Sequence, residues 1–148
     1  MKRTAVAFLA LISFGLGILT FKAAPVARAQ NACSAATVQG SYGLAVNGFF
    51  YDSSGFQGVY DSAGVAVLDG AGGVTGTDTV NIDGTPIRGR KFTGTYTVNA
   101  DCSGTMILKD STGAALTNMD MVVTTGGKEL VLVDYDPDLI IHGTAKLE

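Results

Sequence analysis

The 148-residue chain carries ten basic and thirteen acidic residues, a net charge of −3 at pH 7, and it has a single histidine. A chain without an excess of basic residues is poorly suited to neutralising phosphates, so we exclude nucleic acid as a partner. One histidine also excludes a metal site built on several imidazoles, and we expect neither a metal nor a cofactor.

The first 29 residues have the three-part order of a cleavable signal peptide. Two basic residues precede an apolar run of about 16 residues, 5–20, which is shorter than the roughly 20 residues of a membrane-spanning helix. Ala27 and Ala29 offer the small side chains that the peptidase needs, so we expect cleavage between Ala29 and Gln30. An uncleaved anchor and a lipoprotein acylated at Cys33 are the alternatives; against the second, Gln30 stands where that signal prefers Leu.

Cleavage would leave residues 30–148 as one domain that keeps six basic and thirteen acidic residues, a net charge of −7. We therefore expect a secreted or periplasmic protein, with no membrane insertion after cleavage. Cys33 and Cys102, the chain's two cysteines, allow one intramolecular disulfide in such an oxidising compartment. Closing a loop of about 70 residues should stabilise the fold by roughly 4 kcal/mol. A free, catalytic Cys33 is the alternative, but no histidine lies near it in sequence.

Apolar and polar side chains alternate along the rest of the chain, which is typical of β-strands. Seven turns rich in Gly, Asn and Asp separate the strands. The eight predicted strands are 40–50, 58–68, 74–82, 87–98, 104–109, 115–124, 129–135 and 139–146. Because the connections are short, we expect neighbours in sequence to pair antiparallel.

The third and fourth predicted strands show the clearest two-sided pattern, with a threonine-rich face that should meet water. The residues of that face are Thr75, Thr77, Thr79, Asn81, Lys91, Thr93, Thr95 and Thr97. The basic cluster of Arg88, Arg90 and Lys91 is interpreted as a solvated face of the same hairpin.

Eight sequential strands hide their edges best by closing on themselves, so we predict an all-β, eight-stranded antiparallel up-and-down barrel. Glycines inside the strands suit the tight bends of a barrel. A two-sheet β-sandwich is the alternative, because it uses the same pattern of short strands.

Four stretches, 40–43, 68–77, 92–105 and 136–146, resemble a group of secreted bacterial proteins of unknown role that is similar to the allene oxide cyclase barrel and, more distantly, to the lipocalin-like calycins. The shared motifs are turns and glycines, which specify a fold better than a function. The resemblance implies a cofactor-independent isomerase or cyclase as one possible activity. Related barrels often form trimers, although no residue pattern here specifies an oligomeric state.

Polar residues on predicted inner faces are the candidates for a site. Asp78 and Asp120 fall on such faces, where a carboxylate needs a hydrogen-bond partner or a ligand, and Tyr42 or Tyr96 could be that partner. A face misassigned by one residue is the alternative. The catalytic candidates are Tyr96, Asp120 and Asp78, and the ligand-binding candidates are Tyr42, Tyr60, Tyr96 and Asn118.

Three other groups have simpler interpretations. The aromatic cluster of the first turn, Phe49, Phe50, Tyr51, Phe56 and Tyr60, either lines a barrel mouth or closes the core. His142 is expected to be a satisfied imidazole on or beside the last strand, because no Gly-x-Ser-x-Gly elbow accompanies it. The acidic run Asp134, Asp136 and Asp138 departs from a calcium loop and is interpreted as a solvated turn, with weak calcium binding as the alternative.

Three functions are compatible with these patterns. The first is a binding protein that holds one small apolar molecule in the barrel, where Ala63, Gly64 and Ala66 leave room. The second is the isomerase or cyclase, which would act mainly by positioning its substrate. The third is a structural envelope or surface protein, for which we expect a filled interior.

Overall fold

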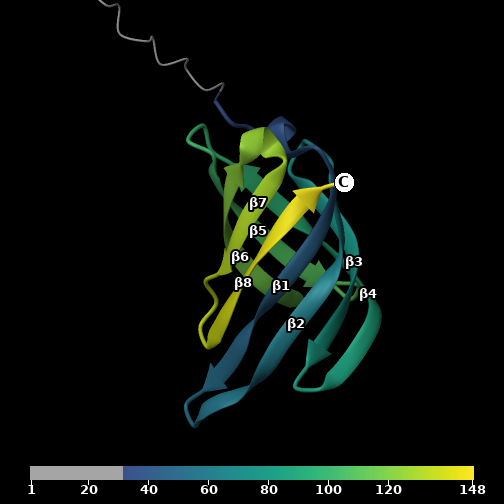
Figure 1. Cartoon of the computed structure of the whole chain (residues 1–148), viewed down its shortest axis with the longest axis vertical. Coiled ribbons are helices and arrows are strands. Elements are labelled where there is room, and N and C mark those ends of the chain that lie inside the picture. Colours follow the sequence, from purple (N-terminus) through teal and green to yellow (C-terminus); the bar gives the residue numbers. More distant parts are fainter. Residues whose placement is uncertain (1–31) are drawn as a thin grey trace, which may run out of the picture.

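The computed structural model describes residues 32–148, so the signal-peptide prediction for residues 1–29 lies outside the described part of the chain. Eight strands form a closed barrel in which each strand pairs antiparallel with the next and the last pairs with the first (Figure 1). The predicted up-and-down barrel is confirmed. The sandwich alternative is wrong, because the pairing of the last strand with the first leaves one continuous sheet.

The eight predicted strands are all present, with small shifts at their ends. The strands are β1 (Gly40–Asp52), β2 (Gly55–Leu68), β3 (Gly73–Ile82), β4 (Thr85–Val98), β5 (Ser103–Asp110), β6 (Ala115–Thr124), β7 (Glu129–Asp134) and β8 (Leu139–Leu147). The largest shift is in the first hairpin, where both strands continue into a tight turn in which Asp52 Oδ1 accepts a hydrogen bond from Ser54 N (2.7 Å). Two short 3₁₀ helices, η1 (Ala35–Val38) and η2 (Thr125–Gly127), were not predicted.

The alternation of side chains places one apolar face inside the barrel. The predicted water-facing residues of β3 and β4 are all exposed, and Val74, Phe92 and Tyr96 between them are buried. Gly76 is needed for this packing, because a Cβ there would lie 2.1 Å from the Phe92 ring. The apolar residues therefore define the inner face of β3 and β4, and the glycine leaves space there for the Phe92 ring.

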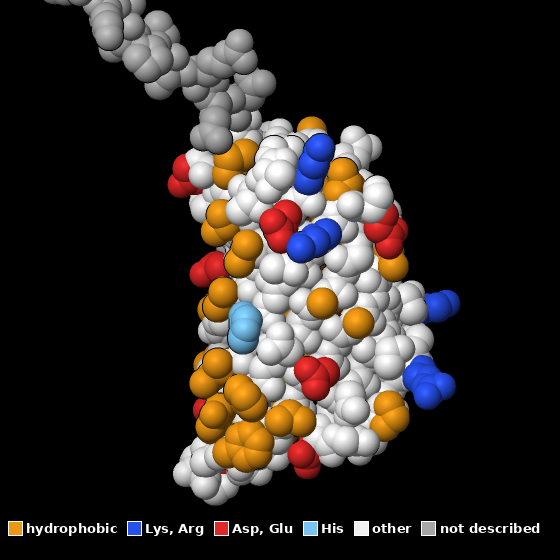
Figure 2. Space-filling model, in the orientation of Figure 1, with side chains coloured by type: hydrophobic (Ala, Val, Ile, Leu, Met, Phe, Trp, Pro, Cys, Tyr) orange, Lys and Arg blue, Asp and Glu red, His pale blue; other side chains and the backbone are white. Residues whose placement is uncertain are grey.

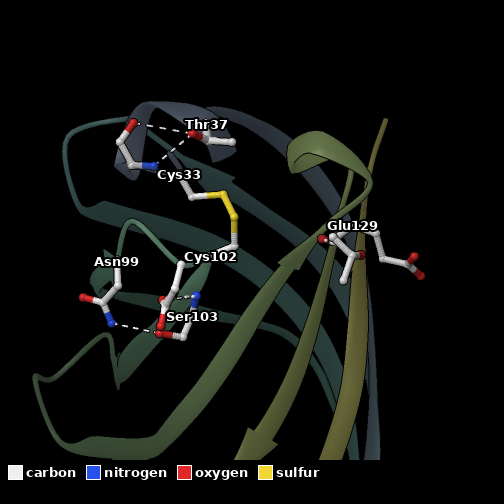
Figure 3. The surroundings of a disulfide bond; sticks show 9 residues. Cys33, Thr37, Asn99, Cys102, Ser103 and Glu129 are labelled. Carbon is white, nitrogen blue, oxygen red and sulfur yellow. Dashed lines mark hydrogen bonds between the residues drawn. A yellow bond between two sulfur atoms is a disulfide. The ribbon is translucent and has the colours of Figure 1, made fainter. Parts of the chain in front are cut away.

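One end of the barrel, which we name the closed end, is sealed by η1, η2 and a disulfide. Val38 of η1 is fully buried there, and the Tyr42 hydroxyl donates a hydrogen bond to the carbonyl of Gly127 in η2. The predicted disulfide between Cys33 and Cys102 is confirmed, and it joins the segment before η1 to the turn between β4 and β5 (Figure 3). Disulfides are typical of oxidising compartments.

The other end, which we name the open end, holds the turns between β1 and β2, β3 and β4, β5 and β6, and β7 and β8. The first two of these hairpins extend farthest at the bottom of Figure 1. Both 3₁₀ helices of residues 32–148 lie at the closed end. Within residues 32–148 no helix is long and apolar enough to cross a membrane.

Candidate functional site

The barrel contains a cavity of about 350 Å³ in the half nearer the open end. Most of its wall is apolar: Leu44, Val46, Phe50, Ile82, Phe92, Leu108, Leu116, Met119, Leu139 and Ile141. Phe50, Ile82 and Leu139 lie at or near strand ends beside the turns and stay partly exposed, so the cavity opens at this end. Its volume is at the small end of the range for ligand sites, roughly 300 to 1,000 Å³.

One side of the cavity wall carries a connected polar group, which we name the polar tetrad: Tyr60, Ser62, Asp78 and Arg90. The Arg90 guanidinium binds the Asp78 carboxylate through two hydrogen bonds, Nε to Oδ1 (3.0 Å) and Nη2 to Oδ2 (2.6 Å). Ser62 Oγ donates to Asp78 Oδ2 (2.7 Å), and Arg90 Nη2 also donates to the Tyr60 hydroxyl (2.9 Å). Asp78 is thereby held as a buried, bidentate ion pair.

The local sequence makes room for this pair. Gly64 lies opposite Asp78 in the β2–β3 register, and a Cβ at Gly64 would lie 2.7 Å from the Asp78 Cβ. On β4, Arg90 lies opposite Asp78, next to a register shift in the β3–β4 pairing. Burial alone would lower the pKa of Arg90, but the hydrogen bonds to Asp78 and Tyr60 outweigh it and raise that pKa, so the guanidinium stays charged.

Arg90 is the functional residue that the sequence analysis misplaced. It was interpreted as part of a solvated basic cluster, and only Arg88 and Lys91 of that cluster are exposed. The signal was present in the sequence, because Arg90 has the same strand parity as the inward-facing Phe92 and Tyr96. Its side chain retains 19 % exposure beside the cavity.

A second buried carboxylate lies on β7, close to the cavity wall. Asp134 is 7 % exposed and accepts hydrogen bonds from the hydroxyl of Thr117, a cavity-lining residue, and from Asp136 N (2.6 Å). Burial raises the pKa of Asp134, and the two hydrogen bonds oppose this shift. The acidic run is therefore not wholly solvated as predicted, because Asp134 points inward as the last residue of its strand.

The structure separates the predicted site residues into three locations. Tyr60 and Asp78 line the cavity. Tyr42 and Tyr96 lie at the closed end, where their hydroxyls donate to backbone carbonyls of Gly127 and Ala35, so neither is the partner of a carboxylate as predicted. The partners of Asp78 are instead Arg90 and Ser62, as described above.

The remaining two site candidates, both on β6, do not face the cavity. Asp120 is exposed on the outer face, so its inward assignment was wrong by one residue; Met119 and Met121 are the inward-facing side chains. Asn118 holds the turn after β7, donating from its backbone N and from Nδ2 to the carboxylate of Asp136 (2.8 and 2.6 Å). Of the predicted site residues, only Tyr60 on β2 and Asp78 on β3 lie together in the cavity wall.

The aromatic cluster of the first turn divides between the two faces of the sheet. Phe50 and Tyr60 line the cavity, as predicted for a barrel mouth. Phe49, Tyr51 and Phe56 are exposed and form edge-on contacts on the outside, with ring centroids 6.0 Å apart for Phe49 and Phe56. Figure 2 shows hydrophobic side chains gathered at this lower corner of the molecule.

Small residues on β2 are likewise divided. Ala66 is buried and Gly64 faces inward, but Ala63 is exposed on the outer face, which corrects its assignment to the interior. Adjacent residues of a strand point to opposite faces, so Ala63 and Gly64 cannot both face inward.

The other polar residues form no metal site in the described part of the chain. His142 is exposed on β8, opposite Asn47 and Val133, as expected for an imidazole on the last strand. No group of three or more His, Cys, Asp or Glu side chains in residues 32–148 is arranged to hold a metal ion.

Comparison of the chain with models of protein families, with curated proteins and with solved structures found no match. The closed eight-stranded barrel is consistent with a calycin-like barrel. The closer resemblance to the allene oxide cyclase group stays a prediction. Function is therefore inferred from the cavity and its polar residues.

Proposed function

We propose that this protein binds one small, largely apolar molecule in the lumen of its barrel. The observation that carries the proposal is the cavity of about 350 Å³, with an apolar wall and an opening at one end of the barrel. Eight-stranded barrels are just wide enough to hold one small ligand when side chains do not fill them.

The cavity favours a binding protein over the structural alternative, for which we expected a filled interior. A void lined by leucine, phenylalanine and methionine side chains loses packing contacts that a ligand would restore. Transfer of an apolar ligand from water would be stabilised by about 25 cal/mol for each Å² of apolar surface that it buries.

We also propose that the chain is exported, as the presequence predicts. The disulfide at the closed end supports this proposal, because such bonds persist in secreted and periplasmic proteins and are rare in reducing compartments. A mature protein that begins at Gln30 in its native host, measured as intact mass, is the expected result; retention of residues 1–29 would contradict it.

Binding is tested by titrating the purified, oxidised protein with N-phenyl-1-naphthylamine, an uncharged apolar dye whose fluorescence rises in apolar surroundings. We expect saturable binding of one dye per chain. Ala115→Trp adds a large ring at the rim of the cavity, where the exposed Ala115 begins β6, and by blocking the opening it should weaken dye binding at least tenfold.

The matched control is Ala63→Trp, which adds the same ring to the outer face of β2 and should leave dye affinity unchanged. Both variants are checked for the wild-type circular dichroism spectrum. Absence of saturable binding to the wild-type protein, or equal binding by both variants, would overturn the proposed function.

A further inference from the structure

The polar tetrad has hydrogen-bond donors that no hydrogen bond within residues 32–148 uses. A guanidinium has five N–H donors. Three of those of Arg90 are used, two by Asp78 and one by Tyr60. No hydrogen bond within residues 32–148 uses the remaining two on Nη1, and Nη1 is not among any buried polar atoms lacking a partner, so it is open to cavity or solvent.

Tyr60 offers a further donor. Its hydroxyl oxygen accepts a hydrogen bond from Arg90 Nη2, and its own proton has no acceptor among the hydrogen bonds of the described residues. Ser62, in contrast, donates its proton to Asp78, whose two oxygens already accept three hydrogen bonds. The polar side of the wall therefore offers unused N–H and O–H donors to a ligand oxygen, and its remaining lone pairs belong mainly to hydroxyl groups such as that of Ser62.

The charges of the cavity wall determine whether a neutral or an anionic ligand oxygen is favoured. The positive charge of Arg90 is already compensated by Asp78, at 2.6 Å between Nη2 and Oδ2. Among the residues that line the cavity Arg90 is the one basic side chain, and Asp134, which accepts a hydrogen bond from the lining residue Thr117, adds a second carboxylate close by. An anionic ligand would thus add an uncompensated negative charge to a wall that has no spare positive one, and burying such a charge is unfavourable.

We infer that the cavity selects uncharged amphiphiles that carry one acceptor oxygen, such as a ketone, ester or lactone carbonyl, over both hydrocarbons and carboxylates of the same length. The carbonyl oxygen accepts from Arg90 Nη1 and the Tyr60 hydroxyl, and the apolar part lies against the apolar wall residues of β6 and β8, such as Leu116, Met119 and Ile141. This inference rests on the proposed function, because it names the ligand class for the same cavity.

The test compares octane, 2-octanone and octanoate as competitors of N-phenyl-1-naphthylamine on the wild-type protein. These ligands match in carbon number and differ in the group that meets the tetrad. We expect 2-octanone to compete about tenfold more strongly than either other ligand, which is the size of effect that a pair of net hydrogen bonds supports. Octanoate equal to or stronger than 2-octanone would overturn the inference.

Two variants locate the selectivity. Tyr60→Phe removes the hydroxyl with little change of shape, and it should reduce the preference for 2-octanone over octane. Tyr51→Phe removes an exposed hydroxyl of the same hairpin from the outer face and is the matched control. An unchanged preference in Tyr60→Phe would also overturn the inference.

The double variant Asp78→Leu with Arg90→Met replaces the ion pair by apolar side chains, and it should show a smaller preference for 2-octanone over octane, because only the Tyr60 hydroxyl remains to donate. If neither the dye nor any of the three ligands binds the wild-type protein, the proposed function itself is overturned. If the dye and all three ligands bind without preference, the proposed function is supported and only the inferred selectivity is overturned.

Discussion

The two ends of the barrel are stabilised by different means. At the closed end a disulfide, two 3₁₀ helices and two buried tyrosines seal the core, and their polar atoms are paired with backbone groups. At the open end an ion pair lies in an apolar wall and leaves donors unpaired. Replacing a buried ion pair by apolar residues is often neutral or stabilising, so we do not expect this pair to add much to stability, and the selectivity proposed above gives it another role.

The largest effect is expected at the closed end, from loss of the disulfide. Replacing both cysteines, Cys33→Ser with Cys102→Ser, avoids a free thiol and frees a loop whose ends are 69 residues apart. We expect the free energy of unfolding, measured by urea titration, to fall by about 4 kcal/mol. Dye affinity of the folded fraction should stay within about twofold, because the cavity opens at the other end; a parallel loss of affinity would show that the two ends are coupled.

The next largest effect is expected from breaking the ion pair at the open end. Asp78→Ala leaves the Arg90 charge without its partner and should lower the free energy of unfolding by roughly 3 kcal/mol, since Arg90 keeps some contact with solvent. The double variant Asp78→Leu with Arg90→Met should recover most of this loss in the same urea titration. Asp120→Ala, on the outer face, is the control and should change stability by less than about 0.5 kcal/mol. If the double variant is as unstable as Asp78→Ala, the loss of stability does not come from the unpaired charge of Arg90.

The smallest effect is expected for Tyr42→Phe, which removes the donor to the Gly127 carbonyl at the closed end. An unpaired buried carbonyl should lower the free energy of unfolding by about 1 to 3 kcal/mol near pH 7. Burial, assisted by the charge of Tyr96, raises the pKa of Tyr42 above that of the unfolded chain. This contribution is therefore complete below about pH 10 and is lost as the pH rises further.

Urea titrations between about pH 7 and 11 measure this dependence. The wild-type protein should lose stability more steeply than Tyr42→Phe at the alkaline end, and Tyr51→Phe, which alters an exposed ring, should follow the wild type. Parallel curves for the wild type and Tyr42→Phe would show that this hydroxyl does not contribute to the alkaline loss.

Most of the fold was predictable because strand alternation and turn residues are local signals. The eight strands and the threonine face follow from residue types at short spacing, whereas the disulfide pairing follows from the presence of just two cysteines and barrel closure from the need to hide the sheet edges. Asp78 and Tyr60 were predictable as inward-facing polar residues, from parity alone. Asp120 was misplaced because the apolar Leu116 and Val122 share its parity. Leu116 reaches the cavity only at the register shift of β6, and the buried Met119 and Met121 mark the true inner face.

The partner of Asp78 was harder to predict, because Arg90 lies in a run of basic residues that is usually solvated. Only the pairing of β3 with β4 places the guanidinium opposite the carboxylate, and this pairing has a register shift beside it. The closed end was missed for a similar reason: η1 and η2 are too short to show helical periodicity, and their contact joins segments that are far apart in the sequence. A Cβ at Gly127 would lie 2.0 Å from the Thr37 carbonyl oxygen, a contact no local pattern reveals.

The even number of antiparallel strands has a practical consequence for the orientation of the molecule. Cys33 and Glu148 both lie at the disulfide-bonded end, with Glu148 N donating to Ser41 O (3.0 Å). Anything attached beyond either of these residues, whether a fusion partner or a linker to a solid support, therefore emerges on the side away from the cavity opening. An immobilised copy would present its mouth to the solution, so small molecules can be offered to it without removing the attachment.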